Sequence, residues 1–180
     1  MRGVTFSIRR ATLDDVPALE RLIAESARGL LRGDYTDAQI EGALAGTFGV
    51  DSEIIRDGTY FVAEAEGGVV GCGGWSRRRT RFGGDLFPGR QSDLLDPARD
   101  AARIRAFFVR PDWARRGIGR AFLERCEAEA AAQGFRSLEL MATLPGLRLY
   151  RASGYAEDAP IEHPLPDGTP IQLVPMRKEL

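Results

Sequence analysis

The chain has 180 residues, of which 43% are apolar and 28% are charged, and these proportions are typical of a globular protein. Its formal net charge of −1 gives no overall field that would attract nucleic acid or an anionic membrane surface. Two cysteines and one histidine provide neither a metal-ligand spacing nor a disulfide framework, and no apolar run is long enough to span a membrane.

The first half of the chain predicts a strand, two helices and a hairpin. Residues 4–10 alternate weakly and predict a strand, and Thr12 followed by Asp15 is typical of a helix start. Apolar residues at helical spacing then predict a helix to about residue 30. A second short helix is expected over residues 36–45, with a further helical turn over 51–58. Residues 60–75 predict a hairpin that turns at Gly67 and Gly68.

The second half alternates strands and helices. Residues 79–101 are a long irregular stretch, and loops of this length are usually functional or mobile. Residues 103–111 predict a strand that is buried on both faces, and a helix with one apolar stripe follows and ends at Gly134. Residues 136–142 predict a strand, and Gly154 ends the next short helix. Two more strands close the chain around a turn at Asp167 and Gly168.

The resulting order is β-α-α-β-β-β-α-β-α-β-β. Its central strand, helix and strand form a unit that predicts a partly parallel sheet with helices on its faces.

Two glycines at the start of the helix after residue 111 are unusual, because glycine destabilises helices. Gly117 and Gly119 stand among Arg115, Arg116 and Arg120. A helix N-terminus has unpaired N–H groups and partial positive charge, and glycine lets an anion approach the backbone. We interpret the segment as a cradle for a pyrophosphate, with a turn chosen for tight strand-to-helix packing as the alternative. The P-loop and dinucleotide-binding patterns are both absent.

The segments "FFVRPDWARRGIGRAFL" and "LYRASGY" together resemble the GNAT family, the GCN5-related N-acetyltransferases. The first is similar to a strand that leads into a [QR]-x-x-G-x-[GA] loop, and the second to an L-Y-x-x-x-G-[FY] ending. Three positions depart from the family's pattern: Ala114 in the first loop position, and Thr143 and Gly146 where relatives often carry Asn and Ala. The resemblance implies an α/β (α+β) fold with a mixed, splayed central sheet flanked by helices.

The resemblance also implies that acetyl-CoA is the acyl donor. The backbone of one loop would hold its pyrophosphate: Arg115, Arg116, Gly117, Ile118, Gly119 and Arg120. The strand residues Phe107, Phe108 and Val109 would offer main-chain groups to the pantetheine arm. A backbone N–H near Phe107 or Val109 would polarise the thioester carbonyl. The amine would attack the thioester directly, and Tyr150 matches the family's tyrosine that serves as general acid toward the departing thiolate.

Other candidate residues carry less specific patterns. Glu139 and Glu64 are candidates for the general base, although each is equally typical of a solvated strand, and a base acting through water leaves no mark in the sequence. Cys72 lies in a buried-strand pattern, which disfavours covalent catalysis, and His163 fits a surface position.

The acceptor site would be built from the connection after the first helix and from the stretch after the hairpin. We single out Tyr35, Trp75 and Arg77 there. The surrounding arginines, which include Arg81, favour an acceptor or acyl group that carries a carboxylate or phosphate. A solvated charged loop is the alternative.

We therefore expect an N-acetyltransferase that acetylates a primary amine of a small molecule or peptide. The alternative is an acyl-CoA-binding regulatory module without turnover, and the intact Tyr150 favours the enzyme. We expect one GNAT domain over residues 1–180, in the reducing cytoplasm, with no metal ion, no nucleic-acid partner and no membrane association. The resemblance is compatible with a homodimer.

Overall fold

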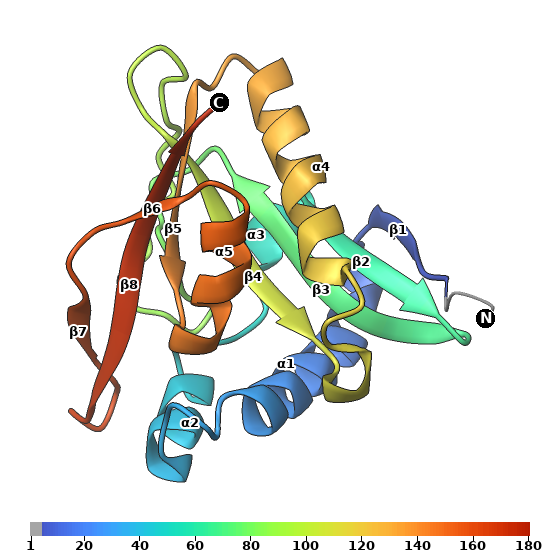
Figure 1. Ribbon diagram of the computed structural model, residues 1–180, viewed down its shortest axis with the longest axis vertical. Helices are drawn as coiled ribbons and strands as arrows, with labels where there is room; N and C mark the ends of the chain where they lie inside the picture. Colours follow the sequence, from blue (N-terminus) through green and yellow to red (C-terminus); the bar gives the residue numbers. More distant parts are fainter. Residues whose placement is uncertain (1–4) are drawn as a thin grey trace.

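A mixed, eight-stranded sheet forms the centre of the computed structural model, which describes residues 5–180 (Figure 1). The strands along the sheet are β1 (Ser7–Arg10), β2 (Tyr60–Ala65), β3 (Gly68–Ser76), β4 (Ala102–Val109), β5 (Ser137–Ala142), β8 (Pro170–Glu179) and β6 (Ala156–Glu157). A further strand, β7 (Ile161–Pro164), pairs with β8. The predicted first strand begins at Ser7, and its residue 4 lies outside the described residues.

The sheet splays open between β4 and β5. These two strands are parallel and pair only through Ala102 with Leu138 and Arg103 with Glu139. Beyond that point β5 continues to pair with β8, over residues 137–142, while β4 continues along β3. The carboxyl end of β4 therefore separates from β5, which confirms the mixed and splayed sheet predicted from the resemblance.

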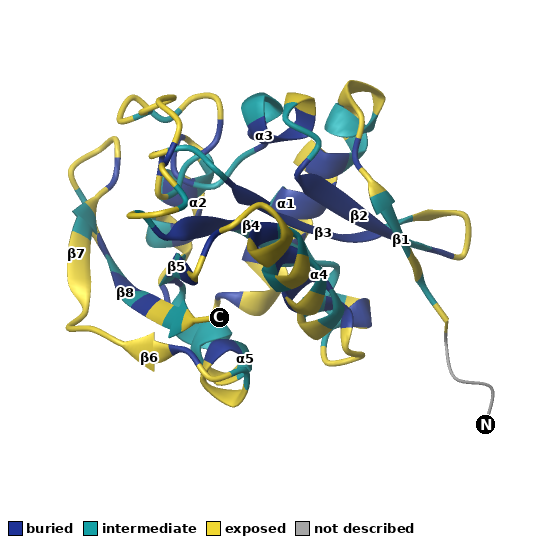
Figure 2. Cartoon of the chain, turned by 90° about the horizontal axis from the view of Figure 1, so that it is seen from above, coloured by how far each residue is buried: buried dark blue, intermediate teal, exposed yellow. Residues whose placement is uncertain are grey.

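Helices cover both faces of the sheet (Figure 2). Helices α1 (Val16–Leu30), α2 (Asp37–Leu44) and α3 (Ser52–Arg56) lie on one side, and α4 (Ile118–Ala132) and α5 (Leu147–Ala152) lie on the other. No described helix is long and apolar enough to cross a membrane.

Each face has its own apolar core. Under α4 and α5 the buried residues include Phe61, Trp75, Phe122 and Leu138. Under α1 and α3 they include Leu19, Ile54, Val62 and Cys72. The strands that contribute to both cores are buried on both faces. The centre of the sheet is therefore a fixed support for the residues where β4 and β5 separate.

Local signals in the sequence place most element ends correctly. The Thr36 hydroxyl accepts from the Gln39 N–H at 3.1 Å at the start of α2, as the capping pattern requires. Gly134 (φ +91°) follows α4 directly after its C-cap residue Gln133. The β2–β3 turn is one residue earlier than predicted, because Glu66 and Gly67 both take positive φ and Gly68 already belongs to β3. The two-residue strand β6 was not predicted.

The stretch after β3 folds back on itself. Residues 77–80 run beside residues 91–95, with backbone bonds from Thr80 N–H to the Gln91 carbonyl (3.0 Å) and from Leu95 N–H to the Arg77 carbonyl (2.7 Å). Arg78 also pairs with Asp57 at 2.7 Å. The loop is therefore held in place on the α3 side of the sheet.

Candidate active site

A cleft of about 530 Å³ opens where β4 and β5 separate. It is lined from one side by α1 and the α2–α3 connection, and from the other side by the start of α4 and by α5. Because these elements cover opposite faces of the sheet, the cleft is reached from both faces. Two reactants can therefore enter from opposite faces and meet beside β4.

An irregularity in β4 shapes the middle of the cleft. The register with β3 passes from Cys72 opposite Phe108 to Gly74 opposite Arg105, so β4 carries one extra residue there. Ala106 has φ +54°, a left-handed conformation that is uncommon for a residue with a side chain. The Tyr60 hydroxyl donates to the Ala106 carbonyl at 2.7 Å and holds the bulge.

Strand alternation places the two neighbouring phenylalanines on opposite faces, and the bulge decides which face each one takes. Phe107 lies 5.8 Å from Phe122 and 6.3 Å from Tyr150, measured between ring centroids. Phe108 lies 5.9 Å from Phe48 on the other face. The sequence predicted that this strand end is buried on both faces, and that prediction is wrong, since Phe107, Phe108 and Val109 are partly exposed where they line the cleft.

The backbone of the same strand end presents an edge to the cleft. Phe108 pairs with Cys72 of β3, so its neighbours Phe107 and Val109 direct their N–H and carbonyl groups to the opposite edge. Consistent with this, the Val109 N–H donates to the Ser26 hydroxyl of α1 at 3.1 Å. An extended ligand could add to this edge as a further strand would.

The start of α4 is open to a ligand. Gly117 is the N-cap residue with φ +86°, and an added Cβ there would meet no atom within 4 Å. The helix's first bond runs from the Ala121 N–H to the Gly117 carbonyl at 3.0 Å, which leaves the preceding N–H groups directed out of the helix. Gly119 differs, because its Cβ would lie 2.9 Å from the Leu149 side chain of α5. One glycine thus keeps the helix end open and the other allows close packing.

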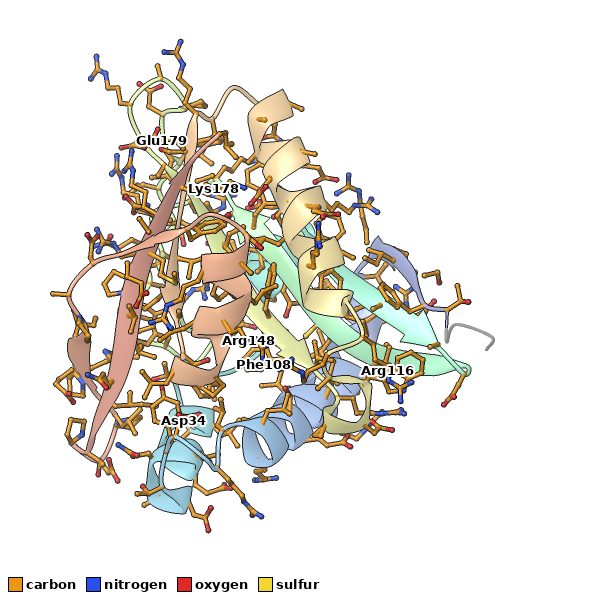
Figure 3. All side chains as sticks on the ribbon, in the orientation of Figure 1. Asp34, Phe108, Arg116, Arg148, Lys178 and Glu179 are labelled. Atoms are coloured by element: carbon orange, nitrogen blue, oxygen red, sulfur yellow. The ribbon has the colours of Figure 1, made fainter. Side chains whose placement is uncertain are left out.

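Three arginines line the cleft near this helix end. They are Arg115, Arg120 and Arg148, and Arg120 also pairs with Glu124 at 2.9 Å. Arg148 and Phe108 both line the cleft, and Arg116 lies to the right of them in the view of Figure 3. Arg116 does not line the cleft, since its guanidinium stacks 4.7 Å from the centre of the Trp113 ring. The sequence did not single out Arg148, although it lies two residues before Tyr150.

Tyr150 of α5 is buried but borders the cleft. Burial raises the pKa of its hydroxyl, so the phenol keeps its proton at any working pH. Among the described residues its hydroxyl has no hydrogen-bond partner, and its ring packs 5.9 Å from that of Tyr155. A protonated hydroxyl at this position can donate to a group that enters the cleft.

The two carboxylates predicted as candidate bases do not line the cleft. Glu139 pairs with Arg103 and, at 3.0 Å, with Arg177, and it borders a smaller separate cavity. Glu64 pairs with Arg9 at 2.8 Å on the far strands of the sheet. Within residues 5–180, the charged side chains that line the cleft all belong to arginine.

The cysteines are not placed for catalysis. Cys72 is fully buried, and burial raises its pKa to about 12, so the thiolate does not form near neutral pH. Cys126 is buried under α4, and burial raises its pKa as well. Both are free thiols that pack in the core.

The three predicted acceptor residues do not reach the cleft. Trp75 is 0% exposed, and its indole N–H donates to Glu129 at 3.2 Å, so it is a core residue. The Tyr35 hydroxyl donates to the Gln172 carbonyl (2.7 Å) and accepts from the Leu144 N–H, so it ties the segment after α1 to β8. Arg77 is half-buried and contributes its backbone to the loop pairing. Other residues of the same two segments do line the cleft, among them Leu30 and Phe82.

The residues that do line this side come from three connections. They include Leu30, Leu31, Thr47, Phe48, Arg81 and Phe82. His163 of β7 lies behind them, 4.8 Å from the Phe82 ring and 3.4 Å from the Thr47 hydroxyl. Sequence analysis placed His163 on the surface, but it is half-buried, and burial lowers its pKa.

A buried ion pair holds these connections in position. Asp51, which caps α3, accepts from Arg105 of β4 at 2.8 Å and from Arg90 of the long loop at 2.9 Å. The Asp51 and Arg105 side chains are only 1% and 2% exposed. Arg105 also donates to the Thr80 and Gly83 carbonyls. One carboxylate therefore joins β4, α3 and the loop beside the cleft.

A splayed sheet, an open strand edge, an open helix end and a protonated tyrosine define a class of protein: acyltransferases that take their acyl group from a pantetheine thioester. The model of the acetyltransferase (GNAT) domain matches residues 56–157. The chain therefore belongs to the GNAT family, which confirms the resemblance seen in the sequence, and it is an acyltransferase. No curated protein sequence matches the chain.

Solved structures of GNAT proteins share this fold. A GCN5-related N-acetyltransferase from Rhodopseudomonas palustris is 20% identical with a TM-score of 0.74, covering 100% of this chain and 99% of that one. PaiA N-acetyltransferase from Thermoplasma acidophilum, solved in complex with coenzyme A, is 14% identical with a TM-score of 0.66, covering 98% and 99%. A ribosomal-protein-alanine N-acetyltransferase from Brucella melitensis is 22% identical with a TM-score of 0.63, covering 97% and 99%. At these identities the similarity describes the fold alone.

Proposed function

We propose that residues 1–180 form one acetyltransferase domain that moves an acetyl group from acetyl-CoA to a primary amine by direct attack. The observation that carries the proposal is the cleft between β4 and β5, which joins an open strand edge to an open helix end. The T. acidophilum relative was solved with coenzyme A, which supports the same cofactor here. Two free, buried cysteines are in keeping with the reducing cytoplasm as its location.

Each part of the cleft would hold one part of the donor. The N–H groups at the start of α4 would bind the pyrophosphate, with Arg115 and Arg120 at the rim. The edge of β4 would pair with the pantetheine. Because the Val109 N–H already donates to Ser26, we assign the role of polarising the thioester carbonyl to the Phe107 N–H.

The proton steps follow from the same lining. The Tyr150 hydroxyl would donate to the sulfur as the carbon–sulfur bond breaks, and coenzyme A would leave as the thiol. An ammonium that enters a cleft lined by arginines meets like charge, which lowers its pKa and favours the neutral, nucleophilic amine. The proton that the amine loses as the amide forms would pass through water, since no carboxylate of the described residues lines the cleft, and it would restore the Tyr150 hydroxyl.

A calorimetric titration of acetyl-CoA tests the donor site. Gly117→Glu places a carboxylate where the pyrophosphate would bind, and we expect it to weaken binding roughly 10-fold or more relative to the wild type. Gly168→Glu is the matched control, because Gly168 has the same φ of +86° and equally open surroundings, but lies in the β7–β8 turn. Equal binding by all three proteins would rule out the helix end as the pyrophosphate site, and no binding by the wild type would rule out the proposed function.

A further inference from the structure

The arginines of the cleft are not equivalent. Arg115 and Arg120 stand at the α4 end and Arg148 on α5, on the face where the donor is proposed to bind. Arg105 is neutralised by Asp51. Arg81 is the remaining arginine, and it comes from the long loop on the opposite face. Its charge is therefore available to the second substrate.

Arg81 lines the cleft without a carboxylate partner among the described residues, unlike the paired arginines of the same loop. Arg78 pairs with Asp57 at 2.7 Å, and Arg90 pairs with Asp51 at 2.9 Å. For the Arg81 side chain, the part of the chain that the structure describes supplies no ion pair and no hydrogen bond. A cation at the wall of a binding cleft, without a protein carboxylate beside it, is a suitable partner for an anionic group of a ligand.

A second cavity, of about 120 Å³, adjoins the cleft at Arg81. Arg81, Leu140 and Met141 line both the cleft and this cavity. Three arginines (Arg81, Arg103 and Arg177) and two carboxylates (Glu139 and Asp158) line the small cavity, so one positive charge is in excess.

Arg103 also lines the small cavity, and its side chain is incompletely paired. The residue is 9% exposed, and its Nε atom is buried without a hydrogen-bond partner among the described residues. Its only carboxylate partner, Glu139, is shared with Arg177. Because the one carboxylate beside Arg103 is shared, the charge of Arg103 adds to that of Arg81, and the two like charges interact unfavourably until an anion lies near them.

The cleft beside Arg81 is otherwise largely apolar on this face. Phe48, Phe82 and Leu31 line the cleft on the same face as Arg81. We infer that the acceptor is a primary amine with an apolar body and a carboxylate, and that Arg81 binds the carboxylate while the amine faces the thioester. The inference rests on the proposed function and excludes polycationic amines, which this lining would repel.

Pairs of acceptors that differ only in the carboxylate test the inference. L-phenylalanine is compared with L-phenylalaninamide, and 4-(aminomethyl)benzoate with 4-(aminomethyl)benzamide, so that two spacings between amine and carboxylate are covered. A third compound, 4-(aminomethyl)phenylphosphonate, distinguishes a carboxylate from a phosphate-like group. Two readouts are used: thiol release with acetyl-CoA, and calorimetric binding to the protein saturated with coenzyme A, which needs no turnover.

For at least one of the two pairs, we expect the acid to have a kcat/KM and an affinity roughly 10- to 100-fold higher than those of the amide, because a hydrogen bond between charged groups contributes this much. Arg81→Gln should abolish the preference. Arg79→Gln should keep it, because Arg79 lies on the same loop but lines neither cavity. Equal binding of acids and amides, a preference that survives Arg81→Gln, or a preference for the phosphonate alone would each overturn the inference.

The two proposals fail in different ways. A wild type that does not bind acetyl-CoA contradicts the proposed transfer. A carboxylate preference in binding that depends on Arg81 but is not accompanied by turnover would support the anion site and contradict the transfer. Turnover of the amides at the same rate as the acids would support the transfer and contradict the anion site.

Discussion

Tyr150 is the single residue on which the proposed chemistry depends most directly. Its ring packs near those of Phe107 and Tyr155, and the residue borders the cleft. Tyr150→Phe keeps the ring and removes the proton donor. We expect kcat to fall roughly 100-fold or more while the calorimetric Kd for acetyl-CoA stays within about twofold, since general acids typically contribute this much to the rate.

Tyr155→Phe is the matched control for that experiment. Tyr155 is also buried in the core, but its hydroxyl donates to Glu127 at 3.1 Å and does not line the cleft. We expect the control to retain its rate. If both variants lose rate equally, the loss reports packing of the tyrosine pair, and Tyr150 is not the acid.

The sequence located single residues at the cleft where a pattern fixes both residue type and position. Tyr150 and Gly117 stand at fixed offsets from motif residues, and the structure brings both to the cleft. Trp75 was chosen because it is an aromatic residue in the right segment, yet strand alternation turns its ring into the core. Arg81 has no local signal that separates it from its arginine neighbours, because its distinguishing feature is the lack of a partner in three dimensions.

At the scale of elements, the acceptor side depends on two connections that meet backbone to backbone. An added Cβ on Gly84 would lie 2.7 Å from the Gly49 carbonyl carbon and 2.8 Å from the Val50 carbonyl oxygen. Because backbone cannot move aside as a side chain can, we expect Gly84→Ala to lower the free energy of unfolding by about 1–3 kcal/mol. It should also raise KM for the acceptor with little change in acetyl-CoA affinity.

Chemical denaturation measures the stability, thiol release gives KM for the acceptor, and calorimetric titration gives the affinity for acetyl-CoA. Gly33→Ala is the control, since its Cβ would meet nothing within 4 Å. A Gly84→Ala protein as stable as Gly33→Ala would show that the two connections are free to separate.

The order of elements was predictable, whereas the shape of β4 was not. Hydrophobic periodicity and the turn residues fix strands and helices, and these signals are local. The Ala106 carbonyl at the bulge accepts from the Tyr60 hydroxyl of β2, which lies two strands away in the sheet and 46 positions earlier in the chain. For the same reason the sequence could not choose between Phe107 and Val109 as the oxyanion donor.

At the scale of the whole molecule, Asp51 joins parts that are far apart in the chain. Asp51→Ala would leave Arg105 buried without its carboxylate, and we expect the free energy of unfolding to fall by about 3–5 kcal/mol. Glu41→Ala, which breaks the exposed pair with Arg28, should have a much smaller effect.

Urea denaturation of both variants measures the difference. Should Asp51→Ala fail to fold, Asp51→Asn gives the intermediate case, since the amide can still accept the α3 capping bond. Similar losses for Asp51→Ala and Glu41→Ala would mean that the buried network does not stabilise the fold.

His163 makes the stability of the whole fold depend on pH in a predictable direction. Burial lowers its pKa in the folded state below the unfolded value of 6.5, so the unfolded chain binds its proton more readily. Stability from this residue is fully present above about pH 6.5 and is lost as the pH falls toward the folded pKa.

His163→Phe keeps a ring against Phe82 and Phe87 but cannot titrate. We therefore expect the Tm of the wild type to fall more steeply than that of His163→Phe between pH 7.5 and 5. Carboxylates contribute equally to both proteins, so the difference between the two curves isolates the imidazole, and parallel curves would show that protonated His163 is accommodated in the fold.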